Sequence, residues 1–278
     1  MPQSSISTDE KLAQINHLLA SMLHQAANEY VVALSDEWGD IFIVEYDDFR
    51  ALKFDEFYEQ SKMRLSEPQK PVFDYIKAML LGAAFSPCQD VLMLGLGGGS
   101  LVRSLHHFNA DIQMTVVEIR PAVIELAFQY FSMPSSPQIQ IIQADAKQYL
   151  TQSDGQFDVI FADLFWALHM DPFQSQRLFF SNCKRQLRDH GWLAINYEQH
   201  AEIDDKLLQM LYHYFDDVLL CAIPNGNAVI LAGSLQQSGG MESFYQRLTA
   251  LEARLQCKMD TLGRKLLRLH PPTKTNKK

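Results

Sequence analysis

The chain has 278 residues, of which 47% are hydrophobic and 21% charged, and its formal net charge is −9 at pH 7. This is the balance of an ordinary globular protein that is long enough to bury a substantial core. The negative charge argues against a broad nucleic-acid surface, because phosphate contacts need clustered Lys and Arg.

The N-terminal part changes character near residue 30. An amphipathic pattern from Leu12 to Leu23 predicts a helix within residues 1–30. The following stretch, "YVVALSDEWGDIFIVEYDDFRALKF", indicates short strands broken by turn residues at 36–39 and 47–48. The sequence therefore predicts a small β domain over residues 31–68, followed by a helix that begins just after Pro71.

From Asp90 onward the pattern alternates between strands and helices. This alternation predicts a parallel sheet with helices on both faces, and thus a Rossmann-like domain over residues 69–257. Asn225-Gly226 is a tight-hairpin signal, so we expect the parallel sheet to end in an antiparallel hairpin. A basic tail is expected over 258–278. The predicted strands are 91–94, 113–118, 139–143, 159–162, 192–196, 217–223 and 228–232, and the predicted helices are 99–108, 121–131, 144–151, 172–188, 204–214 and 241–255.

A glycine-rich loop, "GLGGGS", follows the first strand of this domain and contains four of the 13 glycines of the chain. Glycine permits positive φ and lets a ligand approach the backbone, and the helix that follows offers free N–H groups. The loop is not a P-loop, and Ser100 breaks the G-x-G-x-x-G dinucleotide pattern. By itself it does not separate a nicotinamide ligand from an adenosyl ligand.

Acidic residues end the next three strands, at the edge of the sheet where ligands bind in such folds. Glu118, 19 residues beyond Gly99, could accept both ribose hydroxyls of an adenosine-type ligand. Asp145 is either an ordinary N-cap or an acceptor for the adenine amine. Asp163 is either a strand-end acid without a role or a catalytic group. The four strand ends together predict a nucleoside site.

Four stretches, "VLMLGLGGGSLVRSL", "VVEIRPAVIELAFQYF", "IQIIQADAKQYL" and "FDVIFADLF", resemble the spermidine synthase (polyamine aminopropyltransferase) group, which has the class I S-adenosylmethionine-dependent methyltransferase fold. The resemblance covers roughly residues 41–198. It implies S-adenosylmethionine or its decarboxylated form as co-substrate, no metal, and a homodimer formed through the N-terminal region. The positions that it implies as ligand contacts are Gly95, Gly97, Gly98 and Gly99 around the amino-acid or aminopropyl end, Glu118 on the ribose, Ile119, Asp145 and Ala146 on the adenine, and Gln60 near the ligand. Tyr75 lies near the position of a substrate-side tyrosine of the group.

The sequence departs from the group at three places: in the glycine loop, after the fourth strand, and after Tyr75, where the group has His-Glu and this chain has Ile76-Lys77. The group has G-G-G-D-G in the loop, and Gly98 stands here in place of that aspartate. With no aspartate there, the carboxylate of S-adenosylmethionine could face the loop amides, which favours the un-decarboxylated ligand.

The second departure lies after the fourth strand, where the group has D-S-S-D-P. Asp163 keeps the first aspartate, which in the group helps to deprotonate the attacking amine, but Leu164, Phe165 and Trp166 replace the rest. Burying an ammonium group without a carboxylate is costly, and we expect Leu164 and Trp166 to line the acceptor side. Putrescine aminopropylation is therefore expected to be weak or absent.

Three functions follow from these patterns. The expected one is a transferase that moves an aminopropyl or methyl group to an unidentified small-molecule acceptor, with an amine as the expected class and Asp163 as proton acceptor. The alternatives are a non-catalytic protein that binds an adenosyl ligand and a nicotinamide-dependent oxidoreductase, which Ser100 and the terminal hairpin disfavour. His169 could act as a base, and Glu198 and His200 could line the acceptor side.

Cysteine usage and hydropathy predict a cytoplasmic protein. The four cysteines are far apart and form no C-x-x-C pair, so we expect neither a disulfide framework nor a zinc site. No apolar stretch approaches the roughly 18 residues that span a membrane, and the N-terminus lacks the basic and apolar regions of a signal peptide. Membranes and nucleic acids are therefore not expected partners.

Overall fold

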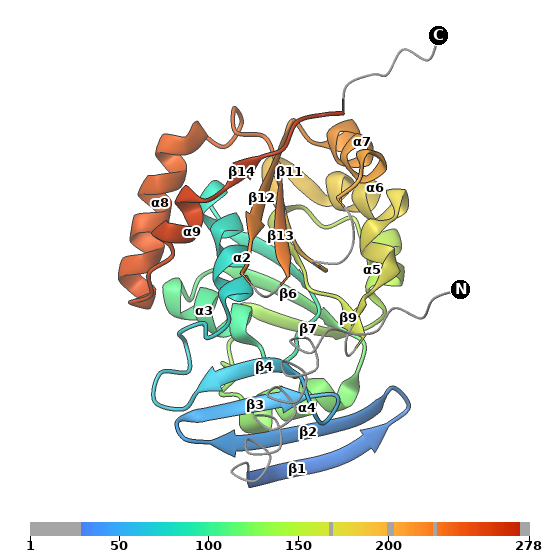
Figure 1. The fold of residues 1–278 in the computed structure, drawn as a ribbon, viewed down its shortest axis with the longest axis vertical. Helices are drawn as coiled ribbons and strands as arrows, with labels where there is room; N and C mark the ends of the chain where they lie inside the picture. Colours follow the sequence, from blue (N-terminus) through green and yellow to red (C-terminus); the bar gives the residue numbers. More distant parts are fainter. Residues whose placement is uncertain (1–28, 167–168, 199–202, 225–226, 273–278) are drawn as a thin grey trace, which may run out of the picture.

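The computed structural model describes residues 29–166, 169–198, 203–224 and 227–272 (Figure 1). The helix expected before residue 29, His200 and the Asn225-Gly226 turn lie outside the described residues. Within the described ranges, no helix combines the length and the apolar character needed to cross a bilayer.

The N-terminal region is a four-stranded antiparallel meander, drawn in blue in Figure 1. Its inner face carries Ile41, Ile43 and Leu52, which are at most 1% exposed. They pack with residues of helix α4, so the small sheet shares a core with the larger domain. The strands are β1 (Glu29–Asp36), β2 (Gly39–Tyr46), β3 (Phe49–Lys53) and β4 (Glu59–Arg64).

The larger domain has an eight-stranded sheet in the order β14-β12-β13-β11-β8-β5-β6-β7. Strands β11, β8, β5, β6 and β7 are parallel, and β12, β13 and β14 run antiparallel to their neighbours. The predicted Rossmann-like sheet with a terminal hairpin is therefore confirmed. The strands are β5 (Asp90–Leu94), β6 (Gln113–Glu118), β7 (Ile139–Gln143), β8 (Phe157–Ala162), β11 (Leu187–Tyr197), β12 (Asp217–Ala222), β13 (Ala228–Gly233) and β14 (Leu267–Arg268).

Helices cover both faces of this sheet, with α2, α3 and α8 on one side and α5, α6 and α7 on the other (Figure 1). Successive strand residues point to opposite faces. Val91 and Met93 accordingly join the first core, and Leu92 and Leu94 join the second. The helices are α2 (Asp74–Phe85), α3 (Ser100–Phe108), α4 (Pro121–Tyr130), α5 (Ala146–Gln152), α6 (Arg177–Gln186), α7 (Asp205–Tyr214), α8 (Gly240–Leu255) and α9 (Asp260–Arg264).

Two segments differ from the sequence-based expectation. The helix expected over 172–188 is a 3-10 turn, Pro172–Ser175, followed by α6, and β11 already begins at Leu187. The tail expected from residue 258 is folded through residue 272, because Met259 is fully buried and β14 covers the open edge of β12. The basic residues of this segment suggested a solvated tail. Its apolar residues nevertheless pack against the core, as buried Met259 shows, and Leu267–Arg268 form an edge strand.

Candidate active site

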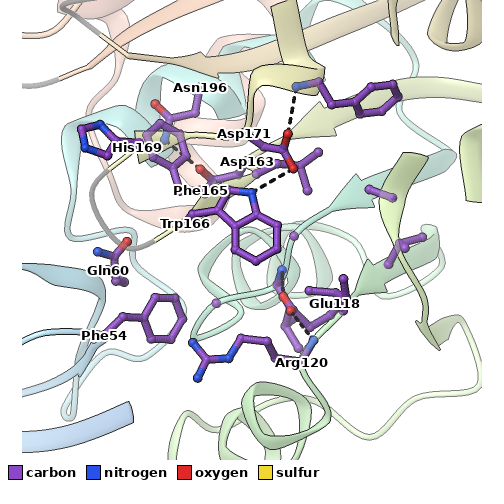
Figure 2. Close-up of a pocket in the computed structure, with 18 of the residues that line it drawn as sticks. Phe54, Gln60, Glu118, Arg120, Asp163, Phe165, Trp166, His169, Asp171 and Asn196 are labelled. Carbon is purple, nitrogen blue, oxygen red and sulfur yellow. Dashed lines mark hydrogen bonds between the residues drawn. The ribbon is translucent and has the colours of Figure 1, made fainter. Parts of the chain in front are cut away.

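A cavity of about 870 Å³ lies where the carboxyl ends of the parallel strands meet the small N-terminal sheet (Figure 2). Strand β5 has β6 on one side and β8 on the other, so the chain order reverses there. Ligands bind at such a switch point in open α/β sheets. Phe54, Tyr58 and Gln60 from the N-terminal region close the opposite wall.

The glycine loop is shaped as much by its protein neighbours as by the cavity. Gly95 has a φ of 93°, and a Cβ there would lie 2.3 Å from the carbonyl oxygen of Asp163. Gly95 and Gly97 line the cavity, but Gly98 and Gly99 are absent from its described lining. A Cβ on Gly98 would meet the Ser61 hydroxyl at 2.8 Å.

Gly98 and Gly99 pack closely against the protein, and a ligand contact through their backbone stays a prediction. A Cβ on Gly99 would lie 2.2 Å from the Met133 sulfur, and its φ of 71° also favours glycine. Gly99 is the N-cap residue of α3. Close packing, as well as ligand approach, thus demands the glycines.

Glu118 lies at the end of β6 and faces the cavity, and it is 8% exposed. Its Oε2 accepts the Leu96 N–H at 3.0 Å, and its Oε1 accepts the Arg120 N–H at 2.9 Å (Figure 2). Burial raises the pKa of this carboxyl, and the backbone N–H groups oppose that rise. A carboxylate has about four acceptor sites, so it can still accept ribose hydroxyls.

Arg120 joins the two parts of the chain beneath the cavity. Its guanidinium makes an ion pair with Asp36 at 2.7 Å and donates to the Gly39 carbonyl at 2.9 Å. It also lies 4.6 Å from the ring centroid of Phe54. The sequence marked Arg120 only as the start of a helix, since the partner Asp36 is 84 residues away.

Ile119, Asp145 and Ala146 also line the cavity. Asp145 accepts the Gln148 N–H at 2.7 Å and caps α5. The N-cap geometry is thus present. A contact between this carboxylate and an adenine amine stays a prediction, which the place of Asp145 in the lining supports.

Asp163 follows β8 and faces the same cavity. Its Oδ1 accepts the Asn196 Nδ2–H at 2.7 Å (Figure 2), and the hydroxyl of Tyr75, which donates to the Gln60 carbonyl at 3.3 Å, lies near it. Burial raises the pKa of Asp163 to about 6, although these two groups oppose the rise and the nearby Glu118 adds to it. A carboxylate tuned in this way can take up a proton near neutral pH.

A short hairpin beyond Asp163, formed by β9 (Phe165–Trp166) and β10 (His169–Met170), covers the acceptor side. Leu164 and Trp166 line the cavity, as the sequence predicts. The Trp166 indole N–H donates to Asp171 at 3.0 Å. Asp171 also accepts the Phe173 N–H at 2.8 Å, which fixes the start of the 3-10 turn.

Two carboxylates that the sequence did not indicate, Asp171 and Glu59, line the cavity in addition to Asp163 and the expected Glu198. Glu198 lies 3.4 Å from the His169 ring nitrogen and accepts the Met170 N–H at 3.2 Å. Asp171 was missed, and its one local signal was an acid immediately before a proline, which is an N-cap pattern.

Gln174 is fully buried and was also missed by the sequence reasoning. Its Oε1 accepts the Leu164 N–H at 3.2 Å, and its Nε2 lies 3.4 Å from the carbonyl oxygens of both Leu164 and Asn196. The side chain therefore holds together the backbone segments that carry Asp163 and Asn196. No sequence pattern marks a buried amide of this kind.

The comparisons with known proteins agree with this geometry. The model of the methyltransferase domain family matches residues 91–191. The polyamine aminopropyltransferase of Chromobacterium violaceum is 28% identical over 222 residues, which cover 77% of this chain and 84% of that protein.

Solved structures show the same fold. A probable spermidine synthase from Corynebacterium glutamicum is similar with a TM-score of 0.66 at 21% identity, over 78% of this chain and 86% of that one. Human methyltransferase-like protein 13, solved in complex with SAH, gives 0.59 at 23% identity, over 67% and 94%. The resemblance seen in the sequence is thereby confirmed: the chain is similar to polyamine aminopropyltransferases, it has the class I methyltransferase fold, and it is a transferase.

Proposed function

We propose that this chain transfers an alkyl group, aminopropyl or methyl, from decarboxylated S-adenosylmethionine or S-adenosylmethionine to a small amine. The observation that carries the proposal is that Glu118 and Asp163 face one cavity of about 870 Å³ from strands on either side of β5. A cavity of this size suits a nucleoside together with a small acceptor.

The nucleoside half of the cavity would hold the adenosyl group through Glu118 on the ribose and Ile119 and Ala146 beside the base. Gly95 and Gly97 would lie along the sulfur-bearing end. Of these residues, Glu118 is the best supported, since two backbone N–H groups fix its carboxylate at the cavity wall.

The transfer step would be an in-line displacement. The lone pair of the amine forms a C–N bond as the C–S bond breaks, and the sulfur leaves as a neutral thioether. The nitrogen then carries a proton that it must lose, and the Asp163 carboxylate accepts it. Holding the two reactants in line supplies most of the acceleration, and the proton acceptor adds to it.

Charge favours aminopropyl transfer over methyl transfer. Asp163, Asp171 and Glu198 line the acceptor side, and a donor with its own carboxylate would face their like charge. Gly98, whose missing side chain favoured that donor at the sequence level, packs against Ser61 and Phe131 away from the described lining. Methyl transfer stays the second candidate because of the match to the methyltransferase domain family.

Isothermal titration of the protein with decarboxylated S-adenosylmethionine, S-adenosylmethionine, methylthioadenosine and NAD tests the ligand class. We expect the three adenosyl ligands to bind, and binding of NAD alone would contradict the proposal. Mass spectrometry of reactions with a panel of amines then tests transfer. Binding without any product would support the non-catalytic alternative.

Putrescine belongs in that panel as a predicted weak acceptor. Asp171 and Glu198 reach the cavity, but both already accept hydrogen bonds from protein donors. Rapid formation of spermidine would show that these two carboxylates replace the lost aspartate.

A further inference from the structure

Gln174 lies behind the wall of the cavity, at the place where the pairing of β8 with β11 stops. The parallel register of these strands ends at Ala162 and Ile195, so Asp163 and Asn196 are the first residues beyond it. Gln174 is fully buried and is absent from the described lining of the cavity. Its polar groups therefore bind protein and not ligand.

The Gln174 amide continues the pairing between the two segments. A side-chain amide carries donors and an acceptor, as a peptide group does. Its Oε1 accepts the Leu164 N–H at 3.2 Å, and its Nε2 lies 3.4 Å from the carbonyl oxygens of both Leu164 and Asn196. A buried amide is costly unless its hydrogen bonds are made, so burial of Gln174 favours this bridge.

The bridge holds the Asp163 backbone on its second side. The Asp163 N–H donates to the Leu94 carbonyl of β5 at 2.9 Å, and the next N–H along the chain, that of Leu164, donates to Gln174. From the other segment, the Asn196 Nδ2 reaches the Asp163 carboxylate at 2.7 Å (Figure 2). The bond to β5 and the Gln174 bridge together therefore set where this carboxylate lies relative to the Asn196 amide.

The turn that carries Gln174 is itself fixed. The Asp171 carboxylate accepts the Phe173 N–H at 2.8 Å at the start of the turn, and the Gln174 N–H donates to the Asp171 carbonyl at 3.0 Å. The Asp171 N–H in turn donates to the Leu164 carbonyl at 2.9 Å. The amide thus extends from an element that is bonded to the same segment that it positions.

We propose that Gln174 is a positioning residue for transfer, which holds the Asp163 carboxylate in the orientation that takes the proton of the attacking amine. This inference rests on the proposed function. A proton acceptor must lie within hydrogen-bond reach of the group that it deprotonates, and a displacement of about 1 Å costs about 100-fold in rate. Gln174 touches neither reactant and acts only through the backbone of Leu164 and Asn196.

The test compares wild type with Gln174→Met, which keeps the length of the side chain and removes both polar groups. We expect kcat for a primary amine to fall about 10- to 100-fold. Affinity for methylthioadenosine should change less than about twofold, since the nucleoside half is untouched. The acid limb of the pH profile should move to higher pH, because Asp163 loses alignment with the Asn196 donor that lowers its pKa.

Gln186→Met is the matched control. Gln186 is also fully buried and also absent from the described lining of the cavity, and its Nε2 donates to the Leu150 carbonyl at 2.8 Å. Both variants should lower the urea midpoint of unfolding, but only Gln174→Met should change kcat and the pH profile. Equal losses of kcat in the two variants, or an unchanged acid limb in Gln174→Met, would mean a merely structural role and overturn the inference.

Gln174→Glu is a milder change that decides the matter even where Gln174→Met fails to fold. Burial, together with Asp163 and Asp171 on the adjoining segments, disfavours ionisation of the introduced carboxyl. Its protonated form supplies a donor and an acceptor, as the amide does. The ratio of its kcat to that of wild type should be near one at about pH 6 and should fall as the carboxyl ionises. A ratio that stays constant from about pH 6 to about pH 9 would overturn the inference.

Failure of the proposed function would be a separate result. Wild type that binds no adenosyl ligand, or that transfers no group to any amine, would overturn the proposed function and this inference with it. Wild type that transfers, together with a Gln174→Met variant that keeps the wild-type kcat, would overturn this inference alone.

Discussion

At the scale of single residues, Asp163 and Glu118 show how one fold gives two buried carboxylates different environments. Two backbone N–H groups hold Glu118. Asp163 accepts a hydrogen bond from the Asn196 side chain and lies near the Tyr75 hydroxyl. Burial raises the pKa of both carboxyls, and for Asp163 it reaches about 6. Glu118 therefore suits a fixed anchor, and Asp163 suits a proton acceptor.

The pH dependence of transfer should report Asp163. The carboxyl must be ionised to accept a proton, so kcat/KM should fall about tenfold per pH unit below its pKa of about 6. In Asp163→Asn, turnover should drop by about 10²- to 10⁴-fold and this acid limb should disappear, while methylthioadenosine still binds. Rates measured from pH 5 to pH 8 check this expectation. If Asp163→Asn kept the same acid limb in its pH profile, the limb would be assigned to protonation of the amine substrate and not to Asp163.

Glu118 should govern nucleoside affinity rather than the transfer step. Glu118→Gln keeps the size of the side chain but loses its charge and places a donor against the Leu96 or Arg120 N–H. We expect methylthioadenosine binding to weaken by about 1–3 kcal/mol, measured by titration calorimetry. Glu59→Gln, a change to another carboxylate in the cavity lining, is the control and should leave nucleoside affinity within about twofold. Equal affinity in Glu118→Gln and wild type would remove Glu118 from the ribose site.

At the scale of elements, the loop between β5 and α3 must pass between a ligand cavity and close protein neighbours. Gly95 lies against the carbonyl of Asp163, whose N–H donates to the Leu94 carbonyl at 2.9 Å. The loop and the segment that carries Asp163 are therefore packed as one unit. A displacement of either would move the other.

Gly95→Ala should destabilise the protein by more than its backbone strain alone. The strain at positive φ costs about 1–2 kcal/mol, and the clash with Asp163 adds to it. Gly240→Ala isolates the strain, because Gly240 has a φ of 75° and a Cβ there would meet nothing within 4 Å among the described residues. Urea denaturation of both variants measures the difference. Equal losses of unfolding free energy in the two variants would show that the loop accommodates a Cβ at position 95 with no cost beyond the backbone strain.

At the scale of the whole molecule, the small N-terminal sheet both shares a core with α4 and supplies a wall of the cavity. The Arg120–Asp36 pair crosses this boundary with side-chain exposures of 8% and 19%. Because both groups are largely removed from water, loss of one leaves the other charge poorly compensated. The position of Phe54 and Gln60 over the cavity should depend on this pair.

Asp36→Asn and Arg120→Met, taken singly and together, test this coupling. We expect each single change to lower the free energy of unfolding by about 2–3 kcal/mol and the double change to be markedly less than additive. The Arg64–Asp48 pair on the same small sheet is the control, since its side chains are 40% and 38% exposed. Arg64→Met should cost less than about 1 kcal/mol. Similar losses of unfolding free energy for the two pairs would contradict the role of Arg120–Asp36 in joining the small sheet to the larger domain.

The sequence by itself determined the order of the elements and which strand ends meet at the cavity. Strand and helix periods are local, and the glycine loop, Glu118 and Asp163 each mark a strand end within a few residues. The carboxyl ends of parallel strands lie at one edge, so these residues could be brought together without coordinates. The hairpin β12–β13 followed from composition in the same way.

Only the tertiary structure decided the acceptor side. Asn196 of β11 donates to Asp163, Gln174 of the 3-10 turn accepts from the Leu164 N–H, Asp171 accepts from the Trp166 indole, and the Arg120–Asp36 pair spans 84 residues. The packing of Gly98 against Ser61 and of the segment after residue 258 against the edge of β12 was not foreseen, because these neighbours are distant in sequence. Hydrogen bonds and packing between distant segments leave no periodic pattern, so the chemistry that selects the acceptor becomes visible only when the chain is folded.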